Sequence, residues 1–305
     1  MANTNPKVSV VIPFYNSEEY INEAVFSILN QSMSNFELLL INDGSKDHSV
    51  EILNSIKDDR MTIINNKDNK GNYFARNLGI GLSRGKYIAM MDSDDISHRN
   101  RLQLQTEYLD HKKHVGAIGS SFKLIDDKGN NLGIVVRPNN YQKFKISLLN
   151  NNSMLQSSLM IRKHLVDKHG LKYNTEFRYA SDYDFVYQCS RLFYIYNLND
   201  AVLSYRVHNS QISQQKKEEQ LYYANLIRFN QFVEFGPEFN TQETRSLLEK
   251  AFNSQPVSDA EYENLIELMD SLITANNEKK IYSRRRLRPF LERILYASAE
   301  LLHTS

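Results

Sequence analysis

Tryptophan is absent from the 305 residues, cysteine occurs once, and no long apolar run is present. The single cysteine, Cys189, excludes a disulfide framework and any zinc or iron–sulfur site built from cysteines. No apolar run approaches the roughly 18 residues that a transmembrane helix needs. Residues 1–7 contain no apolar signal-peptide segment, so we expect a cytoplasmic protein.

An excess of charge is also absent, because 37 basic residues and 36 acidic residues leave a net charge of +1. This balance argues against a general nucleic-acid-binding protein. Hydrophobic residues make up 41% of the chain, which is enough for a sizeable core and excludes disorder. A chain of this length is expected to form one large domain or two modest ones.

Short apolar runs alternate with longer amphipathic segments in the first third of the chain. The amphipathic segments predict helices, the first of them capped by Asn16 with Glu19. The predicted strands are residues 8–13, 36–41, 61–64 and 87–91, and the predicted helices are residues 17–30, 46–56 and 73–82. Strands that are largely apolar and are each followed by a helix are typical of a parallel sheet covered on both faces. We therefore predict an α/β, Rossmann-like fold.

The rest of the chain changes from mixed structure to helix. Further strands are predicted at residues 115–125, 132–136, 155–161, 193–198 and 201–207, and a helix at residues 182–192. Beyond residue 213 the pattern predicts only helices, at about residues 218–233, 241–252, 259–275 and 289–302. We therefore expect a first domain of residues 1–213 and a helical extension of residues 214–305.

Polar clusters follow three strands of the predicted sheet. Pro13 and Tyr15 follow the first strand, Asp43 the second, and residues 92–95 (DSDD) the fourth. The carboxyl ends of parallel strands meet at one edge, which is where ligands bind in such sheets. Taken singly, Asp43 is equally explained by an Asp-Gly turn, and Tyr15 by packing. Their convergence on one edge is the stronger signal.

Neither common glycine-rich phosphate motif is present. The P-loop pattern is missing, and Gly79-Ile80-Gly81 follows a predicted helix instead of a strand. A diphosphate can instead be held through a divalent cation, and the carboxylates of residues 92–95 suit Mg²⁺ or Mn²⁺. The alternative is that an aspartate caps the helix predicted near Arg99, although a cap needs only one. Arg76 is placed either to reach a phosphate or to lie on a solvated helix face.

Six short motifs in order give the chain a recognisable pattern. The motifs are VSVVIPFYN (residues 8–16), INDGS (41–45), GNYFARNLG (71–79), MDSDD (91–95), ASDYDF (180–185) and the segment 205–213, which begins YRVHN. With these motifs the chain resembles family 2 glycosyltransferases of the GT-A fold over about residues 7–213. The resemblance implies an enzyme that moves a sugar from a nucleotide diphosphate to an acceptor.

The resemblance also implies which residues bind the donor. Pro13 and Tyr15 would line the base, and Asp43 would accept the N3 proton of uracil or thymine, so it does not choose between UDP and dTDP. Arg76 would approach the nucleotide, Asp92 would face the ribose, and Ser93 would also belong to the nucleotide-sugar site. Asp94 would hold Mn²⁺ or Mg²⁺, and His208 would complete the metal or diphosphate site. A structural role for His208 is the alternative.

Asp182 is the catalytic base that the resemblance implies, because sugar transfer with inversion needs an acceptor hydroxyl activated by one carboxylate. The alternative is that Asp182 and Asp184 only cap or decorate a helix. Ser181 stands where the family usually has glutamate, which puts in doubt the contact that this carboxylate would make. Tyr179 and Tyr183, beside the predicted base, are candidates for stacking on the acceptor.

The absence of tryptophan narrows the class further. Processive members of this family carry a Gln-x-x-Arg-Trp motif and transmembrane helices, and this chain has no tryptophan and no apolar span. We therefore expect a non-processive transferase that adds one sugar, from a UDP-sugar, to a glycan or lipid-linked acceptor of a surface polysaccharide. The rivals are a nucleotide-sugar-binding partner subunit without catalysis and a sugar-phosphate nucleotidyltransferase. The latter needs a glycine-rich loop after the first strand, where this chain has PFYNSEEY.

The near-zero net charge conceals a basic segment near the C-terminus. Residues 279–293 (KKIYSRRRLRPFLER) contain seven basic residues and one acidic residue, Glu292. Apolar residues recur beside them at helical spacing, so residues 279–301 predict either a basic amphipathic helix on an anionic membrane surface or a packed helix with a solvated basic face. The first alternative would place the enzyme peripherally on the inner face of the membrane.

Overall fold

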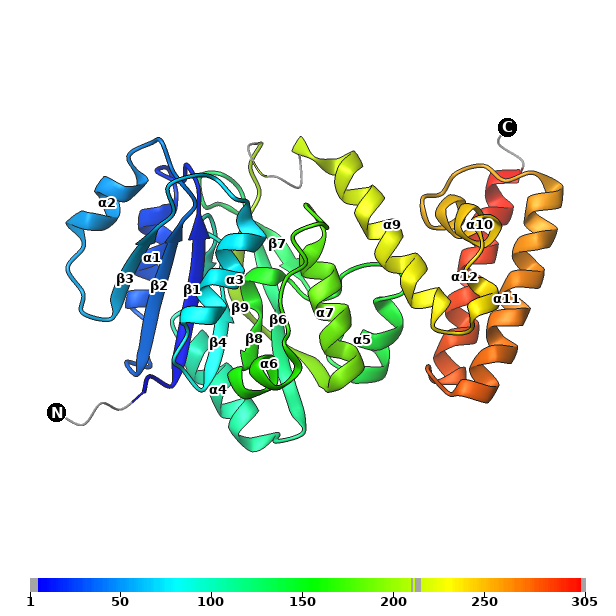
Figure 1. Ribbon diagram of the computed structural model, residues 1–305, viewed down its shortest axis with the longest axis horizontal. Helices are drawn as coiled ribbons and strands as arrows, with labels where there is room; N and C mark the ends of the chain where they lie inside the picture. The colour runs from blue at the N-terminus through cyan, green and yellow to red at the C-terminus, as the bar shows by residue number, and fades with distance from the viewer. Residues whose placement is uncertain (1–4, 210, 212–214, 303–305) are drawn as a thin grey trace. The chain divides into compact units, whose positions relative to one another are not determined.

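The computed structural model describes residues 5–209, 211 and 215–302 (Figure 1). The chain forms two compact units, and the first consists of Met1–Asn139 and Ser153–Gln220. The second consists of Asn140–Asn152 and Leu221–Ser305, so a short segment from the middle of the chain belongs to the C-terminal unit. The domain boundary predicted at Ser213 falls outside the described residues.

The first unit is built on one mixed sheet. In chain order the strands are β1 (Val8–Phe14), β2 (Phe36–Asn42), β3 (Met61–Asn65), β4 (Tyr87–Met90), β5 (Ile96–Ser97), β6 (Val115–Ile125), β7 (Asn131–Val135), β8 (Met160–Arg162) and β9 (Tyr194–Arg206). Their order across the sheet is β3-β2-β1-β4-β8-β6-β9-β5, with β7 paired to β6. The first four strands are parallel to one another, as predicted, whereas β8 runs antiparallel to both β4 and β6.

Helices separate the strands of this sheet. They are α1 (Ile21–Leu29), α2 (Ser49–Ser55), α3 (Asn72–Leu82), α4 (Arg101–His111), α6 (Lys163–His169) and α7 (Ser181–Leu192). Every residue of β1 and β2 is buried, which is the pattern of parallel strands covered on both faces. Helix α3 packs especially closely on β1, because a Cβ atom added at Gly79 would lie 2.3 Å from Cγ1 of Val11. The α/β class predicted from the sequence is confirmed.

Three local predictions were wrong. Asn16 does not cap α1, which begins at Ile21. Asn16 has a φ of 49°, and its side-chain oxygen accepts a hydrogen bond from the backbone N–H of Lys46 instead. The strand predicted at 155–161 is a 3-10 turn, η1 (Gln156–Ser158), followed by the short β8. The two strands predicted at 193–198 and 201–207 form one strand, β9, because register shifts against β6 absorb the polar interruption.

The register of the parallel strands aligns their carboxyl ends. Phe14 of β1 pairs with Asn42 of β2, and Asn42 pairs with Asn65 of β3. On the other side of β1, Val11 pairs with Met90 of β4. The segments that follow β1, β2 and β4 therefore leave the sheet at the same edge, as the sequence predicted.

The second unit is helical and has its own core. Its helices are α5 (Tyr141–Ser147), the larger part of α9 (Lys217–Val233), α10 (Gln242–Phe252), α11 (Asp259–Lys279) and α12 (Arg284–Leu302), with a 3-10 turn, η2 (Pro237–Phe239). Ile146 and Leu149 from the inserted segment lie in the same core as Phe232 and Phe235. The backbone oxygens of Leu148 and Asn150 accept hydrogen bonds from Gln231 and Arg228 of α9. These contacts explain why residues 140–152 belong to this unit.

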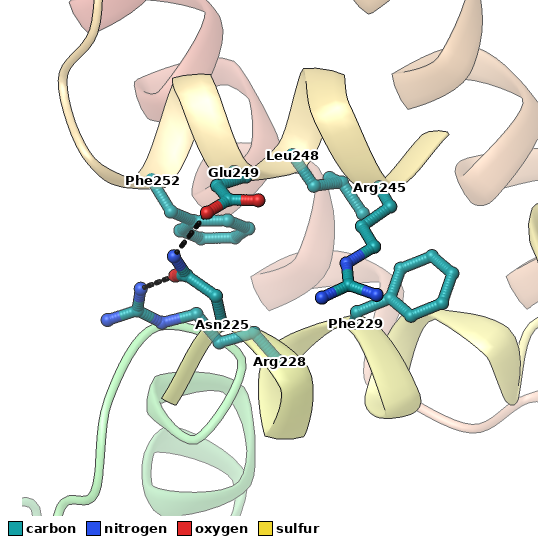
Figure 2. Close-up of a pocket in the computed structure, with 7 residues that line it drawn as sticks. All are labelled: Asn225, Arg228, Phe229, Arg245, Leu248, Glu249 and Phe252. Carbon is teal, nitrogen blue, oxygen red and sulfur yellow. Dashed lines mark hydrogen bonds between the residues drawn. The ribbon is translucent and has the colours of Figure 1, made fainter. Parts of the chain in front are cut away.

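A small pocket lies between α9 and α10 in the second unit (Figure 2). Its volume is about 10 Å³, enough for about one water molecule. Arg228 donates to Asn225 over 2.6 Å, and Asn225 in turn donates to Glu249 over 3.2 Å, as Figure 2 shows. The guanidinium of Arg228 also lies 5.5 Å from the ring centre of Phe252. These polar groups are already paired with one another, so their hydrogen bonds connect the two helices. The pocket therefore offers little to a ligand.

Helix α12 confirms the amphipathic pattern of the basic segment. Its apolar residues Leu287, Phe290 and Leu291 are buried in the core of the second unit. The basic side chains at positions 284, 285, 288 and 293 are exposed. These three apolar residues are therefore covered by the protein itself, whereas the basic residues are available to a partner. No helix in the described part of the chain is long and apolar enough to cross a membrane.

Candidate active site

Asp43 lies at the carboxyl end of β2 and is almost fully buried. Its carboxylate accepts hydrogen bonds from the backbone N–H groups of Lys70, over 3.0 Å, and Gly71, over 2.7 Å. Asp43 therefore ties the end of β2 to the start of α3. Beside it, Pro13 is buried within β1 and Tyr15 is 44% exposed just beyond that strand. The first two predicted clusters thus lie on neighbouring strands.

Arg76 and Asp92 form an ion pair between α3 and the end of β4. The guanidinium of Arg76 is only 2% exposed, and its Nη2 donates to Oδ1 of Asp92. Burial opposes this charge, but the Asp92 carboxylate holds the pKa of Arg76 above its usual value. The other oxygen of Asp92 accepts a hydrogen bond from the hydroxyl of Ser157 over 2.8 Å. Nε and Nη1 of Arg76 have no hydrogen-bond partner in the described part of the chain, which suits an incoming acceptor group.

The three aspartates after β4 have different partners. Asp92 pairs with Arg76, and Oδ2 of Asp94 lies 3.1 Å from Nε2 of His208. Asp95 is fully buried and accepts a hydrogen bond from the backbone N–H of Arg206 over 3.0 Å. Burial, and then the negative charge of Asp94, raise the pKa of Asp95 well above its usual value. Between these aspartates, the hydroxyl of Ser93 lies 2.9 Å from that of Ser17, which follows β1.

Arg206, at the end of β9, connects this aspartate segment to the segment that carries His208. Its side chain is 2% exposed, and its Nε donates to the backbone oxygen of Asp94 over 2.9 Å. Nη1 donates to the backbone oxygens of Asp126 and Asp127, and Nη2 pairs with Glu23. No local signal in the sequence marks Arg206 by itself, although it is part of the motif that contains His208.

Asp94 and His208 are the two side chains in this site that fit a divalent cation. A carboxylate oxygen and an imidazole nitrogen are suitable ligands for Mn²⁺, and the two groups face each other over 3.1 Å. Across residues 5–209, 211 and 215–302, no three His, Cys, Asp or Glu side chains gather closely enough to hold a metal alone. A cation at this pair therefore needs further oxygen ligands from a substrate.

Asp182 lies in the first turn of α7, and its Oδ1 accepts a hydrogen bond from the hydroxyl of Tyr73 over 3.1 Å. Tyr73 and Arg76 are on the same helix, α3, three positions apart. Helix α3 therefore contacts both Asp182 and Asp92. Tyr73 could not be predicted from the sequence, since a tyrosine near the start of a helix gives no signal of a partner more than 100 positions away.

Two neighbours of Asp182 are buried, and for Tyr183 this corrects the expectation that its ring stacks on the acceptor. Tyr183 is only 2% exposed, so it is a core residue and offers no face to an acceptor. Ser181 is fully buried at the start of α7, and its hydroxyl has no hydrogen-bond partner in the described residues. The position at which the family usually has glutamate therefore points into the protein. Burial raises the pKa of the Asp184 carboxyl, which accepts a hydrogen bond from Gln188.

In an open α/β sheet of this kind, ligands bind at the carboxyl ends of the strands, which is where these acidic, basic and aromatic residues lie. Comparison with known proteins identifies the family. Glycosyl transferase family 2 matches residues 9–170, and the chain belongs to this family and is a glycosyltransferase. The chain is 35% identical to an uncharacterised glycosyltransferase of Haemophilus influenzae over 237 residues. The matched region covers 73% of this chain and 72% of that protein. A second uncharacterised glycosyltransferase, of Methanocaldococcus jannaschii, is 31% identical over 230 residues, or 72% of this chain and 78% of that protein.

Solved structures of low sequence identity share the fold. S. aureus TarS (residues 1–349) in complex with UDP-GlcNAc is 18% identical, with a TM-score of 0.63 over 98% of this chain and 91% of that one. A mannosyltransferase from Pyrobaculum calidifontis in complex with GDP-Man and Mn²⁺ is 16% identical, with a TM-score of 0.60 over 98% of this chain and 88% of that one. The predicted GT-A fold and the predicted enzyme class are confirmed.

Proposed function

We propose that this glycosyltransferase moves one sugar, with inversion, from a nucleotide-diphosphate sugar to a hydroxyl of a glycan or lipid-linked acceptor in surface polysaccharide synthesis. The observation that carries the proposal is the contact of one helix, α3, with both Asp92 and Asp182. A donor held near Asp92 and an acceptor near Asp182 would be fixed by the same element. Family membership favours this function over the nucleotidyltransferase alternative.

The donor is proposed to lie along the carboxyl edge of β1, β2 and β4. Pro13 and the exposed ring of Tyr15 would flank the base, and Asp43 would accept its N–H. Asp92 and Ser93 would bind the ribose, while the unpaired N–H groups of Arg76 would face an anionic part of the donor. We propose a UDP-sugar, a donor class that one structural neighbour, TarS, binds in its solved complex.

Mn²⁺ or Mg²⁺ is the proposed cofactor, held by Asp94 and His208. When bound there, the cation would stabilise the negative charge that develops on the departing diphosphate. Oxygens of the donor would supply the ligands that Asp94 and His208 do not. The solved mannosyltransferase complex with Mn²⁺ supports the choice of cation.

Asp182 is the proposed base. Its carboxylate would take the proton of the acceptor hydroxyl as the hydroxyl oxygen bonds to the anomeric carbon. The bond from that carbon to the diphosphate oxygen breaks at the opposite face, so the configuration inverts. The nucleoside diphosphate leaves with the electron pair of the broken bond.

Calorimetric titration with a panel of nucleotide sugars, each with and without Mn²⁺, tests the donor and the metal together. We expect a UDP-sugar to bind in the presence of Mn²⁺ and at least about tenfold more weakly without it, since a cation held by Asp94 and His208 would offset the negative charge of the diphosphate. The Asp94→Asn variant should lose this dependence on Mn²⁺. Preference for a guanosine or cytidine diphosphate sugar would contradict the UDP assignment, and equal affinity without Mn²⁺ would contradict the metal site.

The exposed basic face of α12 is proposed to contact an anionic membrane surface, where a lipid-linked acceptor would lie. Because its apolar residues are buried, this contact would be electrostatic and weakened by salt. Sedimentation with vesicles containing acidic lipid should recover the protein at low salt and not at high salt. Replacing Arg284, Arg285 and Arg288 with Gln should abolish recovery.

A matched variant controls for the loss of positive charge. Replacing the exposed Lys57, Lys112 and Lys113 with Gln removes three positive charges from elsewhere in the chain. This variant should sediment with acidic vesicles as the wild type does. Equal recovery of the wild type with neutral and acidic vesicles would overturn the proposed membrane contact.

A further inference from the structure

Tyr73 donates a hydrogen bond from its hydroxyl to the carboxylate of Asp182, the proposed base. We infer that Tyr73 is a positioning residue, whose hydroxyl holds the Asp182 carboxylate ionised and correctly oriented toward the acceptor. This inference rests on the proposed role of Asp182 as the base. The hydroxyl of Tyr73 lies 3.1 Å from Oδ1 of Asp182, so it reaches one carboxylate oxygen directly.

The ring of Tyr73 is fixed by a stack of aromatic side chains. It lies parallel to the ring of Tyr173, with centres 5.7 Å apart and an interplanar angle of 15°. Tyr173 stacks in turn on Phe185, with centres 4.3 Å apart. Phe185 is on α7, one turn beyond Asp182, and both Tyr173 and Phe185 are buried. The stack therefore connects α3 to the same helix that carries Asp182.

A second set of contacts fixes α3 relative to Tyr173. The side chain of Asn77 on α3 donates to the backbone oxygen of Tyr173 over 2.8 Å and accepts from its backbone N–H over 2.8 Å. Both the ring and the backbone of Tyr173 are thus held against α3. Because the ring stack and the hydrogen bonds of Asn77 both hold Tyr173 against α3, the ring of Tyr73 has little freedom to turn its hydroxyl away from Asp182.

The charges around Asp182 show what the hydrogen bond does. Tyr73 and Arg76 face it from α3, and Tyr173 faces it from the segment before α7. Burial, and then the negative charge of Asp182, raise the pKa of Tyr73 well above its usual value, so its hydroxyl keeps its proton and donates. A donated hydrogen bond stabilises the ionised carboxylate and lowers its pKa. The hydrogen bond from Tyr73 therefore favours the carboxylate form of Asp182, which is the form that a base needs.

The Tyr73→Phe variant tests this inference, because it removes the hydroxyl and keeps the stacked ring. We expect kcat to fall about tenfold, since a hydrogen bond to a charged group is lost. The KM for the donor should stay unchanged. A hydrogen bond donated to a carboxylate favours its ionised form, and activity needs that form, so the acidic limb of the kcat–pH profile should move to higher pH when the bond is lost.

Tyr87→Phe is the matched control, since it removes a tyrosine hydroxyl that donates over 2.6 Å to a carboxylate outside the proposed site, that of Asp110. Its acidic limb should coincide with that of the wild type, and thermal unfolding of both variants shows whether either is destabilised. A wild-type acidic limb in Tyr73→Phe, or the same displacement in both variants, would overturn the inference. If Asp182→Asn keeps wild-type activity, the proposed base itself is wrong, which is a different result.

Discussion

Replacing Asp182 with Asn is expected to lower the rate of glycosyl transfer by about 10²–10⁴-fold, which is the usual contribution of a general base. The amide has nearly the shape of the carboxylate and can still accept the hydrogen bond from Tyr73, but it cannot take a proton from the acceptor. Donor affinity should stay unchanged, because the proposed donor residues belong to other segments. Steady-state rates and a calorimetric Kd for the donor measure both expectations on the same variant.

Asp184→Asn is the control for this substitution. Asp184 is on the same helix, and its carboxylate accepts a hydrogen bond over 2.6 Å from Gln188, one turn further along that helix. Near-normal transfer by Asp184→Asn, together with loss in Asp182→Asn, would support the assignment. Wild-type rates in Asp182→Asn would refute it. A wild type that binds donor but neither transfers nor hydrolyses it would instead support the partner-subunit alternative.

Replacing Arg206 with Met is expected to lower the free energy of unfolding by about 2–4 kcal/mol, because buried polar groups lose their partner. The backbone oxygens of Asp94, Asp126 and Asp127 would lose their hydrogen bonds to the guanidinium. Donor affinity in the presence of Mn²⁺ should also fall, since Arg206 holds the Asp94 segment beside the strand that leads to His208. Urea denaturation and donor titration measure the two effects.

Lys163→Met provides the comparison for the loss of one positive charge. Lys163 pairs with Asp167 one helical turn away, and the Asp167 side chain is 57% exposed. Such exposed pairs contribute about 0–1 kcal/mol, so the stability of this variant should be close to that of the wild type. An Arg206→Met variant as stable as Lys163→Met would show that Arg206 is not the anchor of this segment.

The first four strands and the edge where they end could be predicted from the sequence because the information is local. An apolar run such as residues 36–41 indicates a buried strand by itself, and parallel topology then places Asp43 and Asp92 at one edge. Hydrogen-bond partners from distant segments could not be predicted in this way. Asn16 is a good helix cap in isolation, but its side-chain oxygen accepts a hydrogen bond from the backbone N–H of Lys46, 30 positions later.

Contacts between distant segments also explain what was missed. Tyr73 and Asp182 are 109 positions apart, and no local pattern in either segment names the other. Arg206 was recognised only as part of a motif, since its side-chain partners lie in two separate loops and in α1. The assignment of residues 140–152 to the second unit depends on packing of Ile146 and Leu149 with α9 and α12, which periodicity does not report.

The close packing of α3 on β1 at Gly79 has a consequence for how the reaction is organised. Because a side chain at position 79 would clash with Val11, α3 can lie this close to β1 only with glycine there. The same helix carries Arg76, which contacts Asp92 of the proposed donor site, and Tyr73, which contacts the proposed base. In the proposed reaction, the packing of this helix on the sheet would set the spacing between donor and acceptor, and substrate specificity could change in the surrounding loops without disturbing it.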